Sequence, residues 1–104
     1  MRLAFFDTHR FEQSIFQRLN GDSSFQHDIR FLETRLTAET AVVAEGFPAI
    51  CVFVNDSVSS EVVEALAPRG LRLIALRSAG FNHVDLEACR RHGVRVVRVP
   101  AYSP

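Results

Sequence analysis

The sequence contains no lysine and no tryptophan, and only one methionine, one tyrosine and two cysteines among its 104 residues. Neither sign of charge is in excess, because twelve arginines balance twelve carboxylates. A chain without net charge has no field that attracts nucleic acid or an anionic membrane. We therefore expect neither nucleic acid nor membrane as a partner.

Long hydrophobic runs are also missing. The longest apolar runs, such as 49–54, have about six residues, whereas a membrane helix needs about 20. The first residues enter a strand-like pattern at once, without the apolar stretch of a secretory signal. Cys51 and Cys89 lie in apolar segments without CxxC spacing and are interpreted as buried thiols. These features predict a cytoplasmic protein without disulfides.

Short apolar segments alternate with segments of helical periodicity, at a length that suits one domain. The pattern predicts strands over 2–7, 28–34, 49–54, 71–76 and 94–99. Four helices are predicted between them, the first carrying Phe11 to Leu19, the others starting at Thr37, near Ser59 and at the N-cap Asp85.

This alternation implies right-handed crossovers and an all-parallel sheet, so the predicted fold class is α/β with five parallel strands. Residues 49–54 are apolar on both faces, as in a central strand, while the arginines of 94–99 predict one polar face. No helix follows the last strand. We therefore expect the closing C-terminal helix to be missing and one face of the sheet to be under-covered.

Ligands of open parallel sheets bind beyond the carboxyl ends of the strands. The loops expected there are 7–9, 55–57 and 78–81. The small residues at 78–80 would let an anion approach backbone N–H groups, although from spacing alone a tight strand-to-helix turn that needs glycine is the simpler interpretation.

Catalytic and cofactor motifs are scarce. His9 could act as a general base oriented by Asp7, but a solvated loop histidine is the simpler interpretation. Asp7 and Asp56 do not form the pocket of a phosphoacceptor receiver domain, which requires a lysine. The sequence has no GxGxxG, no phosphate loop and no histidine or cysteine spacing typical of a metal site. We expect this chain to hold no catalytic set, no dinucleotide and no metal.

Three segments resemble the D-isomer-specific 2-hydroxyacid dehydrogenases, most closely the fermentative NAD-dependent D-lactate dehydrogenases. They are Cys51 to Asp56 (CVFVND), Ala75 to Leu86 (ALRSAGFNHVDL) and Val97 to Pro104 (VRVPAYSP). The resemblance implies that 1–104 is the N-terminal part of a substrate (catalytic) domain, with a flavodoxin-like doubly wound fold. The Rossmann domain that binds NAD would lie outside this chain.

The resemblance further implies hydride transfer between NAD and pyruvate or D-lactate. The acid–base histidine with its glutamate, and the arginine that clamps the substrate, would follow Pro104. Of the family's active site, only the wall on the substrate side has matching positions in this chain. The backbone of Ala79 and Gly80 would bind the substrate carboxylate, and Phe53 and Tyr102 would line the pocket. The isolated chain is then expected to be inactive.

Two other interpretations stay open at this point. The chain could be a stand-alone module that binds a small 2-keto or 2-hydroxy acid without catalysis. It could also be a structural piece that assembles with a missing fragment, or with itself as a homo-oligomer, through an uncovered apolar face.

Overall fold

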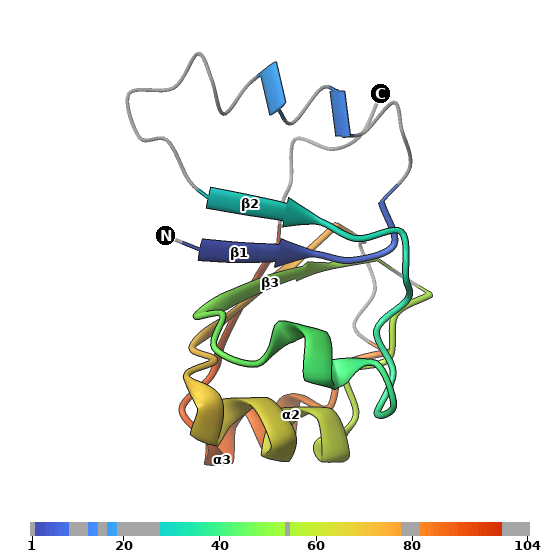
Figure 1. The fold of residues 1–104 in the computed structure, drawn as a ribbon. Coiled ribbons are helices and arrows are strands. Elements are labelled where there is room, and N and C mark those ends of the chain that lie inside the picture. Colours follow the sequence, from blue (N-terminus) through green and yellow to red (C-terminus); the bar gives the residue numbers. More distant parts are fainter. Residues whose placement is uncertain are drawn as a thin grey trace.

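The fold was analysed in a computed structural model, which describes residues 2–8, 13–14, 17–18, 28–53, 55–77 and 82–98. Five strands form one sheet in the order β2-β1-β3-β4-β5 (Figure 1). The strands are β1 (Arg2–Phe5), β2 (Asp28–Phe31), β3 (Ala49–Val52), β4 (Leu73–Leu76) and β5 (Arg95–Arg98). All four neighbouring pairs are parallel. The predicted flavodoxin-like five-stranded sheet is thus confirmed.

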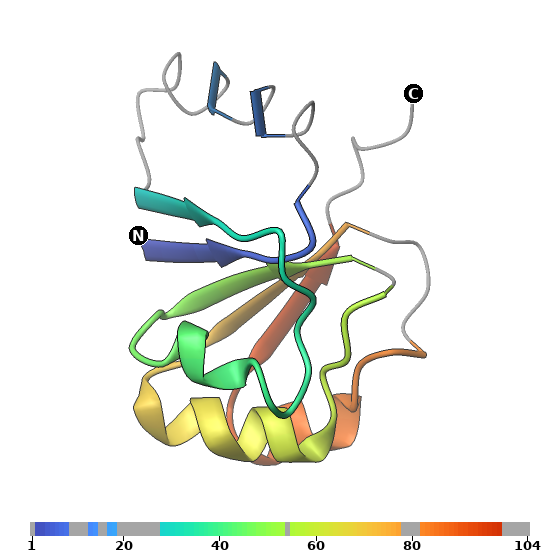
Figure 2. The same ribbon diagram turned by 45° about the vertical axis from the view of Figure 1, so that its right-hand side comes forward.

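Four helices lie together on one face of this sheet (Figures 1 and 2). They are η1 (Ala41–Ala44) and η2 (Ala67–Arg69), both 3₁₀ helices, and the α-helices α2 (Ser60–Leu66) and α3 (Leu86–Arg91). The apolar faces of these helices meet alternate residues of the central strands in one core. Its fully buried members include Ile50, Val52, Ile74, Leu76, Val62, Val63 and Leu66.

Two helix starts follow from side-chain capping. The Ser59 side chain accepts a hydrogen bond from the N–H of Val62, and the Asp85 carboxylate accepts one from the N–H of Ala88. Both caps satisfy N–H groups that have no partner within the helix, so α2 and α3 begin where the sequence predicts. After η2 the chain turns into β4 through Gly70, whose φ of 111° suits glycine.

The opposite face of the sheet becomes more exposed toward β5. One row of paired residues crosses it from Phe31 through Phe5, Cys51 and Ala75 to Val97. Phe5 is 1% exposed and its ring lies 5.3 Å from that of Phe31, whereas Val97 is 41% exposed. Among the described residues, this face is therefore least covered along β5, in line with the prediction of an under-covered face.

The structure corrects two details. The helix expected from Thr37 is only a 3₁₀ helix, because the Thr37 hydroxyl closes a turn with Thr40 by accepting its N–H, and η1 starts after that turn. The prediction of one polar face on β5 is wrong. Arg95 and Arg98 are three positions apart and pair with Leu73 and Leu76, so they point to opposite faces of the sheet.

The predicted strands also include 6–7, 32–34, 53, 71–72 and 94, which lie in connecting loops of the structure, whereas 54 and 99 lie outside the described residues. Of the first predicted helix, 13–14 and 17–18 are helical, and the remainder lies outside the described residues. No helix in the described ranges is both long and apolar enough to span a bilayer.

Candidate functional site

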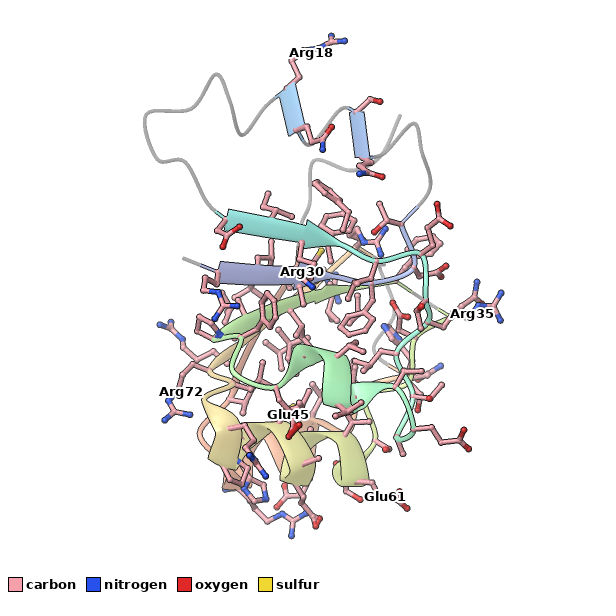
Figure 3. All side chains as sticks on the ribbon, in the orientation of Figure 1. Arg18, Arg30, Arg35, Glu45, Glu61 and Arg72 are labelled. Atoms are coloured by element: carbon pink, nitrogen blue, oxygen red, sulfur yellow. The ribbon has the colours of Figure 1, made fainter. Side chains whose placement is uncertain are left out.

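Buried polar side chains gather at one edge of the sheet. Four polar or charged residues are buried in the described part of the chain: Asp7, Thr8, Asp56 and Arg77, between 1% and 7% exposed. They follow β1, β3 and β4, whose carboxyl ends lie at the same edge (Figure 2). Exposed charged residues such as Arg35, Arg72 and Glu61 project outward instead (Figure 3). This edge is the place where open parallel sheets bind ligands.

Asp56 joins two loops of this edge through its carboxylate. Oδ1 accepts a hydrogen bond from the N–H of Leu36 and Oδ2 accepts one from the N–H of Phe53, each over 2.7 Å. The N–H of Asp56 in turn donates to the carbonyl of Phe53 over 3.0 Å. Both backbone polar groups of Phe53 are therefore bonded to Asp56.

The pKa of Asp56 is raised above its ordinary value of 3.8, chiefly because burial disfavours the charged carboxylate. The negative charge of Asp7 acts in the same direction. The two backbone N–H groups and the positive charge of Arg77 lower the pKa, but the net shift is upward.

Arg77 lies between the loops that follow β1 and β3. Its guanidinium donates to the carbonyl of Phe6 and, over 3.4 Å, to that of Asp7. The guanidinium carbon lies 4.3 Å from the centre of the Phe5 ring and 5.2 Å from that of Phe53. A planar guanidinium can stack on an aromatic face while its N–H groups bond in the plane, which an ammonium cannot do.

The turn after β1 has an unusual backbone. Asp7 has φ of 51°, the left-handed region, and its N–H donates to the carbonyl of Thr34 over 3.0 Å. Thr8 closes the same turn, because its hydroxyl donates to the carbonyl of Phe5 over 2.8 Å. The Oδ2 atom of Asp7 is buried without a hydrogen-bond partner among the described residues.

Of the predicted substrate-binding residues, the structure describes Phe53 alone. Phe53 is half-buried at the end of β3, beside the guanidinium of Arg77. Ala79, Gly80 and Tyr102, and also the candidate base His9, lie outside the described residues. Their roles stay predictions.

The other histidines and cysteines offer no catalytic set in the described part. His83 is half-buried, and burial lowers its pKa below the ordinary 6.5. His92 is exposed at the end of α3, and both cysteines are buried thiols. No group of three or more metal-ligating side chains occurs among the described residues. This part of the edge is therefore suited to shape a binding wall, and its side chains do not form an acid–base centre.

Sequence reasoning missed the role of Arg77 and considered Asp56 only as part of the acidic pocket of a receiver domain, an interpretation that it rejected. One signal was available: a charged residue that directly follows an apolar parallel strand lies at the carboxyl edge of the sheet. The partners of the two side chains could not be read in this way, because they come from other strands and loops.

Comparison with known proteins agrees with this architecture. Residues 3–104 match the family described as D-isomer specific 2-hydroxyacid dehydrogenase, catalytic domain. The 2-hydroxyacid dehydrogenase homolog 1 of Schizosaccharomyces pombe is 49% identical over the whole chain, which covers 31% of that relative. The D-lactate dehydrogenase of Escherichia coli is 45% identical over the same length, again 31% of the relative. The chain thus spans about a third of the curated relatives that it matches.

Solved structures give the same result. The apo-structure of the Escherichia coli D-lactate dehydrogenase superposes with a TM-score of 0.89, at 44% identity, over all of this chain and 32% of that one. The D-lactate dehydrogenase of Aquifex aeolicus, complexed with NAD and lactic acid, superposes with a TM-score of 0.77, at 30% identity, over 98% of this chain and 29% of that one. By sequence and by fold, this chain belongs to the D-isomer specific 2-hydroxyacid dehydrogenases and represents part of their catalytic domain.

Proposed function

We propose that this chain forms the N-terminal part of the substrate domain of an NAD-dependent D-lactate dehydrogenase. The reaction would be hydride transfer between the nicotinamide of NAD and the keto carbon of pyruvate. The observation that carries the proposal is the 45% identity to the Escherichia coli D-lactate dehydrogenase over all 104 residues. The Aquifex aeolicus relative, solved with NAD and lactic acid, supports the same pair of ligands.

The sheet topology supports a substrate wall at the carboxyl edge. Phe53 follows β3 and the segment 78–80 follows β4, and these two strands are neighbours. Their carboxyl ends therefore lie side by side, which would bring the backbone of Ala79 and Gly80 close to the ring of Phe53. In this proposal the two N–H groups bind the substrate carboxylate, while Phe53 and Tyr102 exclude water from its apolar side.

The residues of this chain do not fit the cofactor. A dinucleotide pyrophosphate needs a glycine-rich turn and a helix N-terminus, and the sequence has no GxGxxG. The buried carboxyl groups Asp7 and Asp56 would moreover repel a phosphate at this edge. We therefore assign NAD binding, and the acid–base chemistry, to a Rossmann domain outside this chain. A cytoplasmic location and a homo-oligomeric assembly stay predictions.

A hybrid enzyme tests the proposal. Residues 1–104 replace the matched segment of the Escherichia coli D-lactate dehydrogenase, and NADH oxidation is followed with pyruvate. We expect the hybrid to reduce pyruvate to D-lactate, and the isolated chain to be inactive, because it lacks the cofactor site. A Phe53→Ala hybrid should have a higher KM for pyruvate, whereas Val42→Ala, on the exposed side of η1, should not.

Two results would contradict the proposal. One is a hybrid that folds, binds NADH and fails to reduce pyruvate. The other is millimolar or tighter binding of pyruvate or D-lactate by the isolated chain in calorimetry, which would favour a stand-alone binding module.

A further inference from the structure

We propose that Asp56 and Arg77 are positioning residues for Phe53. Asp56 holds its backbone and Arg77 holds its ring, and together they set the affinity for the keto acid substrate. This inference rests on the proposed function for its consequence, since it assigns no contact with substrate to either residue. The geometry behind it belongs to residues of this chain alone.

Asp56 fixes the backbone of Phe53. It accepts the N–H of Phe53 at Oδ2 and donates its own N–H to the Phe53 carbonyl. Its second oxygen anchors this turn to Leu36, which is fully buried, in the segment after β2. The end of β3 is thus tied to the core across the sheet, and the turn cannot rotate without breaking bonds to a charged acceptor.

Arg77 fixes the ring of Phe53. Its guanidinium makes cation–π contacts with two rings, that of Phe53 and that of the fully buried Phe5. Its N–H groups bond to the carbonyls of Phe6 and Asp7, so the guanidinium itself is held in place. A ring next to a fixed, planar cation has fewer accessible positions than one next to a flexible side chain.

Stability alone does not account for these charges. Moving a carboxylate and a guanidinium out of water costs free energy that their mutual attraction repays only in part. Asp56 and Arg77 are 1% and 3% exposed, and apolar residues in their place would avoid that cost but would leave the N–H groups of Leu36 and Phe53 without their acceptor. What apolar residues could not supply is the pair of directional contacts to one residue, Phe53.

The test compares Asp56→Asn and Arg77→Lys in the hybrid enzyme. Asparagine keeps the shape of Asp56 but has only one oxygen, so it can accept a hydrogen bond from the N–H of Leu36 or of Phe53 but not from both. Lysine keeps the charge of Arg77 but has no planar group that can stack on the Phe53 ring. We expect each variant to raise the KM for pyruvate about threefold to tenfold, the effect of one lost hydrogen bond, while kcat stays close to that of the parent.

Asp85 provides the matched controls. Asp85→Asn keeps the cap of α3, and Asp85→Ala removes it and lowers the melting temperature without touching Phe53. Neither should change KM. The inference is overturned if Asp56→Asn and Arg77→Lys leave KM unchanged, or if Asp85→Ala raises it as much as they do.

Amide and ring spectra of the isolated chain separate this inference from the proposed function. In nuclear magnetic resonance, Asp56→Asn should shift the amide signals of Leu36 and Phe53, and Arg77→Lys should shift the ring signals of Phe53. Unchanged spectra overturn the inference whatever the hybrid does. The hybrid that carries the unsubstituted residues 1–104 could be inactive while the spectra of the variants shift. This outcome would count against the proposed function. It would demonstrate the positioning contacts but overturn their effect on substrate affinity.

Discussion

The N–H of Leu36 donates to the carboxylate of Asp56 over 2.7 Å, although the two residues are 20 positions apart in the chain. Because Leu36 follows β2 and Asp56 follows β3, this bond connects loops of two strands that are not neighbours in the sheet. The edge is therefore braced across β1, the strand between them.

Removing this carboxylate should destabilise the chain. Asp56→Ala leaves the N–H groups of Leu36 and Phe53 without their acceptor, and we expect a loss of about 2 kcal/mol in the free energy of unfolding. Chemical denaturation measures it. Ser57→Ala, at the exposed next position, is the control and should change the free energy by less than about 0.5 kcal/mol. If Asp56→Ala lowers the free energy of unfolding no more than the control does, water has replaced the carboxylate as acceptor of the two N–H groups.

The left-handed turn after β1 makes a second prediction. Asp7 has φ of 51°, which glycine adopts freely and alanine does not. Asp7→Gly and Asp7→Ala both remove the buried carboxylate, so they differ only in the backbone. We expect the glycine variant to be more stable by about 1 kcal/mol in denaturant unfolding. Equal stabilities would mean that the turn relaxes to a negative φ.

The stability of the chain should fall at mildly acidic pH because of His83. Burial lowers its pKa from 6.5, so below that pH the unfolded chain binds a proton that the folded chain resists. The stability contribution is present above pH 6.5 and is lost as the pH falls. In urea unfolding at about pH 7.5 and about pH 5, His83→Asn should flatten this dependence. His92→Asn, at an exposed position, should leave it as steep as in the parent.

The core under α2 should respond strongly to truncation. Leu66 is 1% exposed and faces the sheet, so Leu66→Ala leaves a cavity and is expected to cost about 3 kcal/mol. Val42→Ala, 63% exposed on η1, should cost less than about 0.5 kcal/mol. Thermal or chemical unfolding of the two variants gives the comparison, and similar losses would contradict the packing described for this face.

The sequence was sufficient for the fold because its signals are local. Ser59 and Asp85 each cap a helix within three residues, and the apolar segment 49–54 identifies the central strand without knowledge of its neighbours. The strand order then follows from the right-handed crossover rule and the family resemblance.

The candidate site was harder to predict because its contacts are distant in sequence. The bond from Arg77 to the Phe6 carbonyl spans 71 positions, and no periodicity reports such a pairing. The prediction of one polar face on β5 was wrong for a different reason. Alternation of residue types suggested one polar face, whereas the odd spacing of Arg95 and Arg98 places them on both.

The parallel sheet also constrains the order in which the chain can fold. No two neighbouring strands can be joined by a hairpin, so each pairing must close a long loop. The β1–β3 pairing joins Leu3 to Ala49, whereas the β1–β2, β3–β4 and β4–β5 pairings each close a loop of about half that length. Pulsed hydrogen exchange during refolding should therefore protect the amide of Arg77, which donates to the Val52 carbonyl of β3, before the amide of Phe6, which donates to the Cys51 carbonyl of β3; the reverse order would contradict this assignment. The residues that brace the carboxyl edge are then among the last to meet, so the binding wall is completed only when β1 has paired with β3.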